Sequence, residues 1–286
     1  MSSSIGLFDS GVGGLSVARE IMRQLPAHPL IYLADQGHAP YGQRPLAEIR
    51  DFAGGITRFL LSQGAQVIVV ACNTASAAAL HWLRHEFPDV PFVGMEPAVK
   101  PAVERTRTHH VGVIATAATF QGELFASLLE RYASDVIVHT QICPELVPLV
   151  EAGELDTPRT RAAVRTYLAP LSAAGIDELV LGCTHYPFLR PLIEAALGPA
   201  VDVIDPAPAV ARQTARLLTQ RGWLDDARPS RSCEPPVRLR PRRSHRFYTT
   251  GDPARFGLAL HHLLGLEAAV CAAAWASDGH LLRIAK

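Results

Sequence analysis

Two cysteines, Cys72 and Cys183, each follow an apolar run that is typical of a buried strand and precede a segment that can open a helix. Inverting the α-carbon of an amino acid requires a base on one face of that carbon and an acid on the opposite face. Two thiols that face one another across a cleft could supply both groups, one as a thiolate and the other as a thiol. Either cysteine alone is better explained as a small apolar filler of the core. The hypothesis therefore depends on the two positions being equivalent.

Polar side chains follow both cysteines and also follow the first apolar run of the chain. They are Asp9, Ser10, Asn73, Thr74, Thr184 and His185. Backbone N–H groups at a helix start, together with hydroxyl and amide side chains, suit the carboxylate or ammonium group of a small ligand. Asp9 could hold an ammonium group or assist proton transfer at Cys72. His185 could assist Cys183 in the same way. Helix capping explains each of these polar residues equally well on its own.

An internal repeat places the two cysteines at equivalent positions. Three segments recur in the same order at offsets of 106 to 111 residues: 5–10 at 111–116, 69–74 at 180–184, and 93–98 at 203–207. The repeat indicates two similar α/β halves. Ligands of open α/β sheets bind at the carboxyl ends of the strands, where both cysteines would then face one cleft.

Apolar runs rich in Val, Ile and Leu alternate with helical patterns along the chain. The predicted buried strands cover residues 5–8, 30–33, 67–70, 92–94, 111–114, 136–138, 179–181 and 201–204. The predicted helices cover residues 15–24, 46–63, 75–86, 122–132, 160–174 and 209–221. A further strand is expected at residues 247–250, followed by a helix that ends at Leu264. This alternation predicts parallel βαβ units.

These elements predict an α/β fold of two similar α/β domains with mainly parallel sheets, related by pseudo-two-fold symmetry, with the active site in the cleft between them. The first domain would comprise residues 1–96 and, since the chain returns at its C-terminal end, residues 208–286. The second would comprise residues 97–207. The Arg- and Pro-rich segment 228–246 is expected to be a solvated loop and not a nucleic-acid patch, because no aromatic residue interleaves it. The roles of that segment and of the tail 267–286 stay open.

The composition excludes several classes of protein. The chain has 286 residues, enough for two domains of roughly 150 residues each. Lys plus Arg and Asp plus Glu number 27 each, so a strongly basic nucleic-acid binder is disfavoured. No uncharged apolar run reaches about 18 residues, so no membrane span is expected. The start of the chain lacks a basic region followed by an apolar one, and a cytoplasmic location is therefore expected.

No cofactor and no metal ion are expected. The five cysteines form an odd set without a CxxC pair, which indicates reduced thiols and not a zinc site, and a structural role is expected for Cys143, Cys233 and Cys271. With Lys100 and the C-terminal lysine as the only lysines, a Schiff base to pyridoxal phosphate is disfavoured. The turn at residues 11–16 (GVGGLS), with Asp35 about 20 residues on, resembles a dinucleotide fingerprint whose third glycine is Ser. Nicotinamide binding is a weak alternative.

Five short motifs are distributed over the chain: IGLFDSGVGG at 5–14, PYG at 40–42, ACNTA at 71–75, VPLVE at 147–151 and GCTHYP at 182–187. Together they resemble the glutamate racemases of the cofactor-independent aspartate/glutamate racemase superfamily. Weaker agreement at 96–98, 204–205 and 247–265 extends the resemblance over most of the chain. It implies interconversion of L- and D-glutamate by a two-base proton transfer at Cα, which supplies D-glutamate for peptidoglycan synthesis. The oligomeric state stays open, with a homodimer as one alternative.

The resemblance also implies roles for single residues. Cys72 and Cys183 would be the two proton donors and acceptors. Asp9 and His185 would assist them, and Glu151 would be an accessory group. The residues implied to contact the substrate are Asp9, Ser10, Tyr41, Gly42, Asn73, Thr74, Thr116, Thr119, Thr184 and His185.

The chain departs from the family pattern at residues 36–39 (QGHA), so no substrate role is implied for Asp35 or Gln36. The Thr-His pair after the second cysteine resembles the glutamate branch, whereas aspartate racemases typically carry Thr-Glu. Two alternatives remain. The chain could be another member of the superfamily that acts on aspartate or decarboxylates a substituted malonate with one thiol. It could also be a binding or regulatory module, although both thiols and their polar neighbours argue against that.

Overall fold

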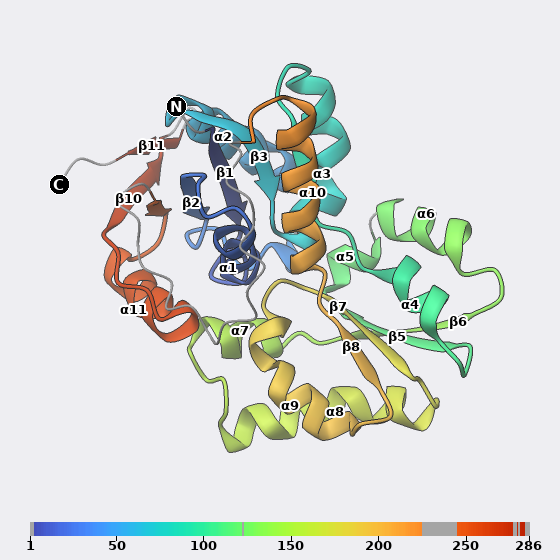
Figure 1. Ribbon diagram of the computed structural model, residues 1–286. Helices are drawn as coiled ribbons and strands as arrows, with labels where there is room; N and C mark the ends of the chain where they lie inside the picture. The colour runs from blue at the N-terminus through green and yellow to red at the C-terminus, as the bar shows by residue number, and fades with distance from the viewer. Residues whose placement is uncertain (1–2, 122, 225–244, 277–278, 280, 284–286) are drawn as a thin grey trace.

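The computed structural model describes residues 3–121, 123–224, 245–276, 279 and 281–283. Within these residues the strands form two separate sheets, of seven and four strands, flanked by helices (Figure 1). The larger sheet contains β1 (Ser4–Asp9), β2 (Leu30–Ala34), β3 (Ala65–Val70), β4 (Phe92–Gly94), β9 (Arg246–Thr249), β10 (Val270–Trp275) and β11 (Leu281–Arg283). The smaller sheet contains β5 (His110–Ala115), β6 (Ile137–Ile142), β7 (Glu178–Gly182) and β8 (Asp202–Ile204).

The two sheets share one strand order. In the larger sheet β2, β1, β3 and β4 lie side by side, and in the smaller sheet β6, β5, β7 and β8 do so, with every neighbouring pair parallel. Every residue of β2 and of β7 is buried, as expected for parallel strands covered on both faces. The predicted α/β fold, with two similar halves and mainly parallel sheets, is confirmed.

Helices connect the strands and bury one face each. Around the larger sheet lie α1 (Leu15–Gln24), η1 (Tyr41–Gln43), α2 (Leu46–Ser62), α3 (Asn73–Glu86), α10 (Ala207–Gln220) and α11 (Pro253–Leu264). Around the smaller sheet lie α4 (Val99–Arg105), α5 (Ala117–Gln121), α6 (Glu123–Tyr132), α7 (Leu146–Glu151), α8 (Pro158–Ala173), η2 (Tyr186–Leu189) and α9 (Arg190–Leu197). α1 places Leu15, Ala18 and Met22 on one buried face, at the helical spacing of three and four residues. α10 packs against α1, so the chain returns to the larger sheet after β8 (Figure 1).

Three helices, α3, α8 and α10, each begin two residues before the predicted start. α3 begins at Asn73, before the predicted start at residue 75, because the Cys72 Sγ accepts a hydrogen bond from the Ala75 N–H at 3.4 Å and caps the helix. The first cysteine is thus fixed by the helix that it starts. α1 begins at Leu15, as predicted, and the backbone N–H groups of Gly11 and Gly14 just before it donate hydrogen bonds to the buried Asp9 carboxylate.

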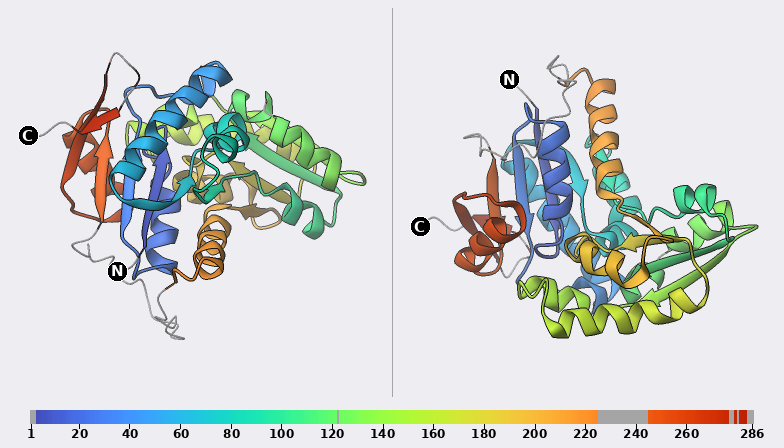
Figure 2. Two further views of the ribbon diagram at one scale, coloured as in Figure 1. Left: turned by 90° about the horizontal axis from the view of Figure 1, so that it is seen from above. Right: turned by 60° about the horizontal axis from the view of Figure 1, so that its bottom comes forward.

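The structure adds elements that the sequence patterns did not predict. β6 extends to Ile142, beyond the predicted end at residue 138, because it is an edge strand whose outward residues obscure the apolar pattern. α4, α5 and α7 have seven, five and six residues, too few to show a helical period. In the tail, β10 pairs in parallel with β9, and β11 pairs antiparallel with β10. Figure 2 shows these C-terminal strands, in red, at the edge of the larger sheet away from the second half.

The predicted strand near residue 247 and the helix after it are present as β9 and α11, and β9 pairs in parallel with β2. Residues 225–244, which include Cys233 and most of the Arg- and Pro-rich segment, lie outside the described residues. The domain boundaries drawn from the sequence stay a prediction. In the part of the chain that the structure describes, no helix is both long enough and apolar enough to cross a membrane.

Candidate active site

A cavity of about 100 Å³ lies at the carboxyl ends of equivalent strands from the two sheets. Its wall contains the residues that follow four of these strands: Ser10 after β1, Cys72 after β3, Thr116 after β5 and Cys183 after β7. The wall also contains Pro40, Gly42, Gln43, Asn73, Thr74, Ala117, Ile142, Cys143, Pro144, Val147, Pro148, Thr184 and His185. Since open α/β sheets bind ligands at this edge, the cavity is the candidate active site.

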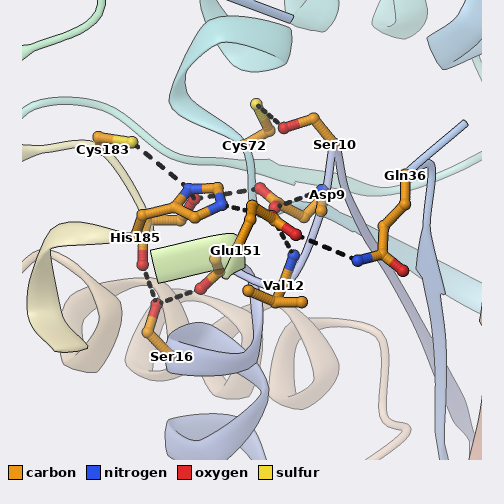
Figure 3. Close-up of polar contacts among 12 residues, drawn as sticks. Asp9, Ser10, Val12, Ser16, Gln36, Cys72, Glu151, Cys183 and His185 are labelled. Carbon is orange, nitrogen blue, oxygen red and sulfur yellow. Dashed lines mark hydrogen bonds and ion pairs between the residues drawn. The ribbon is translucent and has the colours of Figure 1, made fainter. Parts of the chain in front are cut away.

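Both thiols line the cavity and are almost fully buried. Cys72 Sγ donates a hydrogen bond to Ser10 Oγ at 3.8 Å (Figure 3). Cys183 Sγ lies 3.6 Å from His185 Nδ1. Burial, together with the nearby negative charge of Asp9, raises the pKa of the Cys72 thiol to about 12. Cys72 is therefore a protonated thiol at neutral pH.

His185 lies between Cys183 and Glu151 (Figure 3). Its Nε2 forms an ion pair with Glu151 Oε1 at 2.7 Å. Burial lowers the pKa of His185, but the hydrogen bonds and negative charges of Cys183 and Glu151 outweigh it and raise that pKa well above its ordinary value. Burial raises the pKa of Glu151, and the hydrogen bond and charge of His185 outweigh it and lower that pKa. An imidazolium therefore faces Cys183 at neutral pH.

Asp9 is fully buried behind the cavity wall. Its Oδ2 accepts a hydrogen bond from the Gly11 N–H at 2.9 Å, and its Oδ1 accepts one from Thr184 Oγ1 at 3.2 Å. Burial raises the pKa of Asp9, and the positive charge of His185 and the hydrogen bonds from Gly11 and Gly14 oppose that rise without cancelling it. The carboxyl group thus connects the end of β1 to the residue that follows Cys183.

The glycine-rich turn after β1 contacts Glu151 and His185 of the other half. A methyl group at Gly11 would collide with the Glu151 carboxylate, and one at Gly13 would collide with the His185 ring. The Val12 N–H donates to Glu151 Oε1 at 2.8 Å. The turn therefore already holds an anionic carboxylate, which the pyrophosphate of a dinucleotide would have to displace. This geometry argues against the nicotinamide alternative.

One side of the cavity carries polar groups without a full set of partners. Asn73 is buried, and neither polar atom of its side chain has a hydrogen-bond partner among the described residues. Buried amides are nearly always paired, so Asn73 is suited to bind a polar ligand group. Beside it, Thr74 Oγ1 lies 2.9 Å from Thr116 Oγ1, which lies 3.0 Å from Thr119 Oγ1. These hydroxyl groups can reorient to donate to a carboxylate.

The structure brings most of the sequence-predicted site residues to the cavity wall. Those that line it are Ser10, Gly42, Cys72, Asn73, Thr74, Thr116, Cys183, Thr184 and His185. The others, which lie outside the wall, are Asp9, Tyr41, Thr119 and Glu151. The Tyr41 hydroxyl donates to Asp35 at 2.6 Å, and Asp35 does not line the cavity. Gly42 lies against Thr116, and a methyl group at Gly42 would meet Thr116 Cβ at 3.0 Å.

Sequence reasoning missed two residues of the site. Gln36 Nε2 donates to Glu151 Oε2 at 3.1 Å, a contact between segments 115 residues apart. Cys143 lines the cavity although only a structural role was expected for it. Its position directly after β6 matches that of Cys183 after β7, so the end of a strand was a usable signal. Within the described residues, no group of three or more His, Cys, Asp or Glu side chains could hold a metal ion.

Comparisons with known proteins show which family the chain belongs to. A family profile described as Asp/Glu/Hydantoin racemase matches residues 5–214. A glutamate racemase of Ectopseudomonas mendocina is 49% identical over 266 residues, which cover 93% of this chain and 96% of the relative. A crystal structure of a glutamate racemase from Bacillus anthracis is 36% identical with a TM-score of 0.81 and covers 94% of this chain and 96% of that one.

A second solved structure is that of Escherichia coli glutamate racemase in complex with L-glutamate and the activator UDP-MurNAc-Ala. It is 30% identical with a TM-score of 0.80, and the match covers 99% of this chain and all of that one. The family profile spans well over half of the chain, and the relatives match it over almost their whole length. The chain therefore belongs to the Asp/Glu/Hydantoin racemase family, among its glutamate racemases, and is an amino-acid racemase.

Proposed function

We propose that the chain interconverts L- and D-glutamate without a cofactor, by a two-base proton transfer at Cα in which Cys72 and Cys183 are the bases. The observation that carries this proposal is that both thiols line one cavity from equivalent strand ends of the two halves. A substrate bound between them would present one face of its α-carbon to each sulfur, as inversion requires. Glutamate is proposed as the substrate because the relatives are glutamate racemases and the Escherichia coli structure holds L-glutamate.

The two thiols have different electrostatic surroundings. Cys72 keeps its proton, whereas the imidazolium of His185, 3.6 Å from the Cys183 sulfur, stabilises a negative charge there. In one direction the Cys183 thiolate takes the Cα proton. An S–H bond forms as the C–H bond breaks, and the electron pair stays on Cα. The Cys72 thiol then gives its proton to the opposite face and becomes a thiolate. The reverse direction exchanges the two roles.

Helper groups accompany each thiol. We propose that Glu151 keeps His185 charged beside Cys183, through the 2.7 Å ion pair. Asp9 is proposed to assist Cys72, whose thiol lies within reach of its charge, or to hold the substrate ammonium group. The first role fits the raised pKa of Asp9, because a carboxyl group whose pKa lies closer to neutral pH exchanges protons more readily there.

The substrate carboxylates are proposed to bind the polar residues around the cavity. Asn73 supplies an amide without a protein partner, and the hydroxyl groups of Thr74 and Thr116 lie beside it. The proposed substrate contacts are Asp9, Ser10, Tyr41, Gly42, Asn73, Thr74, Thr116, Thr119, Thr184 and His185. The supply of D-glutamate for peptidoglycan synthesis, a cytoplasmic location and a homodimer are further parts of the proposal, taken from the sequence and the family.

The proposal is tested by proton NMR of L-glutamate in D₂O with purified, reduced protein and no added cofactor. We expect loss of the Cα–H signal together with decay of the optical rotation to zero. Cys72→Ala and Cys183→Ala should each abolish racemization. Cys271→Ala is the matched control, because Cys271 lies on β10 outside the cavity wall and should leave turnover unchanged. Substantial turnover by either active-site variant would exclude the two-base assignment. No exchange with either enantiomer of glutamate would exclude glutamate as the substrate.

A further inference from the structure

β10 ends at Trp275, whose side chain contacts Asp35, the residue that follows β2. The indole N–H of Trp275 donates to Asp35 Oδ1 at 2.9 Å, across 240 residues of sequence. Asp35 follows β2, and its backbone N–H donates to the carbonyl oxygen of Asp9, the last residue of β1. Through Trp275 and Asp35, β10 is therefore connected by hydrogen bonds to the carboxyl ends of β2 and β1.

Asp35 is a buried carboxylate on which several segments converge. It has no exposed surface, and its oxygens accept hydrogen bonds from Tyr41 Oη at 2.6 Å, Thr250 Oγ1 at 2.7 Å and Trp275 Nε1 at 2.9 Å. His38 Nδ1 lies 3.0 Å from Asp35 Oδ2. Burial raises the pKa of Asp35, but the hydrogen bonds of these side chains outweigh it and lower that pKa. Asp35 is thus an ionised carboxylate that depends on its donors, and losing one reduces the stabilisation of this buried charge.

One of these donors belongs to the segment that forms part of the cavity wall. Tyr41 begins η1, and its side chain is buried with the hydroxyl on Asp35. The residues around it, Pro40, Gly42 and Gln43, line the cavity. The 2.6 Å bond from Tyr41 to Asp35 therefore fixes the position of this part of the wall.

The Trp275 ring packs tightly beside this segment, in space that Gly55 leaves open. Its ring lies against Gly55 of α2, where a methyl group would meet Trp275 Cζ3 at 2.5 Å and Cη2 at 2.6 Å. It also packs against His38 and Phe52, with ring centroids 5.4 Å and 5.6 Å away. The His38 and Phe52 rings stack at 4.0 Å, and Phe52 packs against Tyr41. The aromatic cluster holds the indole in the orientation that points its N–H at Asp35.

We propose that Trp275 is a positioning residue for the substrate-binding segment 40–43, acting through Asp35 and Tyr41. Removal of its N–H leaves Asp35 short of a donor, loosens the Tyr41 anchor and weakens the binding of substrate. The thiols and the His185–Glu151 pair belong to other segments and are connected to this one through the hydrogen bond from Gln36 to Glu151, so the larger effect is expected on substrate binding. This inference rests on the proposed glutamate racemization only where substrate kinetics are used to test it.

Trp275→Phe removes the N–H donor and keeps an aromatic ring, and Trp82→Phe is its matched control. Trp82, on α3, packs against Gly54 of α2, the neighbour of Gly55. A methyl group at Gly54 would meet Trp82 Cη2 at 3.0 Å, and Trp82 does not line the cavity. For Trp275→Phe we expect KM for glutamate to rise about five- to tenfold, with kcat within about twofold of the wild type. Trp82→Phe should change neither constant, even if both variants lose similar thermal stability.

Tyr41→Phe removes the other end of the same connection. It should reproduce the split between KM and kcat, and the double variant Tyr41→Phe with Trp275→Phe should fall short of the product of the single effects. An unchanged KM in Trp275→Phe, or a loss confined to kcat, would overturn the positioning role.

Hydrogen exchange separates this inference from the choice of substrate. Amides of residues 36–44 should exchange faster in Trp275→Phe than in wild type or Trp82→Phe, with or without glutamate turnover. Equal exchange in all three proteins would refute the positioning role. Faster exchange in protein that does not turn over glutamate would leave the inference standing while the proposed substrate fails.

Discussion

The Glu151 carboxylate and the His185 imidazole form an ion pair 2.7 Å long whose two members come from the end of α7 and the loop after β7. Both members belong to the half that contains the smaller sheet, but Glu151 also contacts the other half. Glu151 accepts a hydrogen bond from the Val12 N–H of the glycine turn after β1, and a side chain at Gly11 would collide with it. The electrostatic environment of Cys183 is thus completed by the first half, so the proposed proton transfer depends on the fit between the halves.

Glu151→Gln tests this dependence. The variant keeps the size of the side chain but removes the negative charge that helps raise the pKa of His185, so that pKa should fall. His185 would then lose its proton at a lower pH. We expect the basic limb of the kcat/KM profile to move to lower pH, with a fall of about 100-fold at neutral pH. Glu145→Gln, at the exposed start of α7, is the control and should retain the wild-type profile. An unshifted basic limb in Glu151→Gln would contradict the role of the ion pair.

Gly11→Ala tests the position of the Glu151 carboxylate rather than its charge. The added methyl group would occupy the position of the Glu151 carboxylate, and overpacking of this kind costs about 1–3 kcal/mol. We expect a lower melting temperature and a large loss of kcat, measured by calorimetry and polarimetry. Gly257→Ala, in α11, is the control because a methyl group there meets no atom within 4 Å. It should be neutral or stabilise the protein by about 0.5–1 kcal/mol. Wild-type turnover in Gly11→Ala would show that Glu151 can bind elsewhere.

Asp177 gives a prediction for stability against pH. Its carboxylate accepts hydrogen bonds from Thr106 Oγ1, Thr108 Oγ1 and the Arg107 N–H, which outweigh the opposing effect of burial and lower its pKa to about 2. The unfolded value is about 3.9, so the stabilisation is complete above about pH 5 and is lost as pH falls toward 2. Asp177→Asn should lower the urea midpoint at pH 7, and this difference should shrink between about pH 5 and pH 3. Asp156→Asn, in an exposed ion pair, should have little effect at any pH. A difference that is constant with pH would refute the assignment.

The main architecture could be predicted because its signals are local. A parallel strand covered on both faces must be apolar throughout, so a run such as residues 67–70 identifies a strand without any knowledge of its neighbours. The residue after such a strand then lies at the ligand-binding edge of the sheet. These local signals predict that Cys72 and Cys183 lie at that edge, the repeat indicates that they are equivalent, and both line one cavity.

The supporting contacts could not be predicted because they join distant segments. Gln36 reaches Glu151 across 115 residues, and Trp275 reaches Asp35 across 240. The local helix and strand patterns of the sequence do not predict contacts between residues so far apart. β10, with the sequence VCAAAW, also lacked a strand signal, because its small side chains carry little β preference and its place is fixed by pairing with β9. The two thiols of the cavity wall were therefore predictable, and the distant residues that hold the wall in place were not.

Asn73→Ala tests whether the amide without a protein partner is a ligand group. Removing a buried amide that has no hydrogen bond takes away an unfavourable burial, so the free energy of unfolding should stay equal or increase. If Asn73 binds the substrate, KM should rise about tenfold or more, and the rise in melting temperature that glutamate produces in the wild type should diminish. Calorimetry with and without glutamate, together with steady-state kinetics, measures both effects.

Ser76→Ala is the matched control, because Ser76 lies on the same helix, is equally buried and has its partners. Its hydroxyl donates to the Val70 carbonyl oxygen at 3.0 Å and accepts from the Met95 N–H at 2.9 Å. This variant should lose about 1–3 kcal/mol of stability and keep the wild-type KM. The two substitutions thus have opposite expectations for stability and for binding. A structural role for Asn73 would instead make both variants unstable with unchanged KM, since a side chain that supports the fold must be bonded within it.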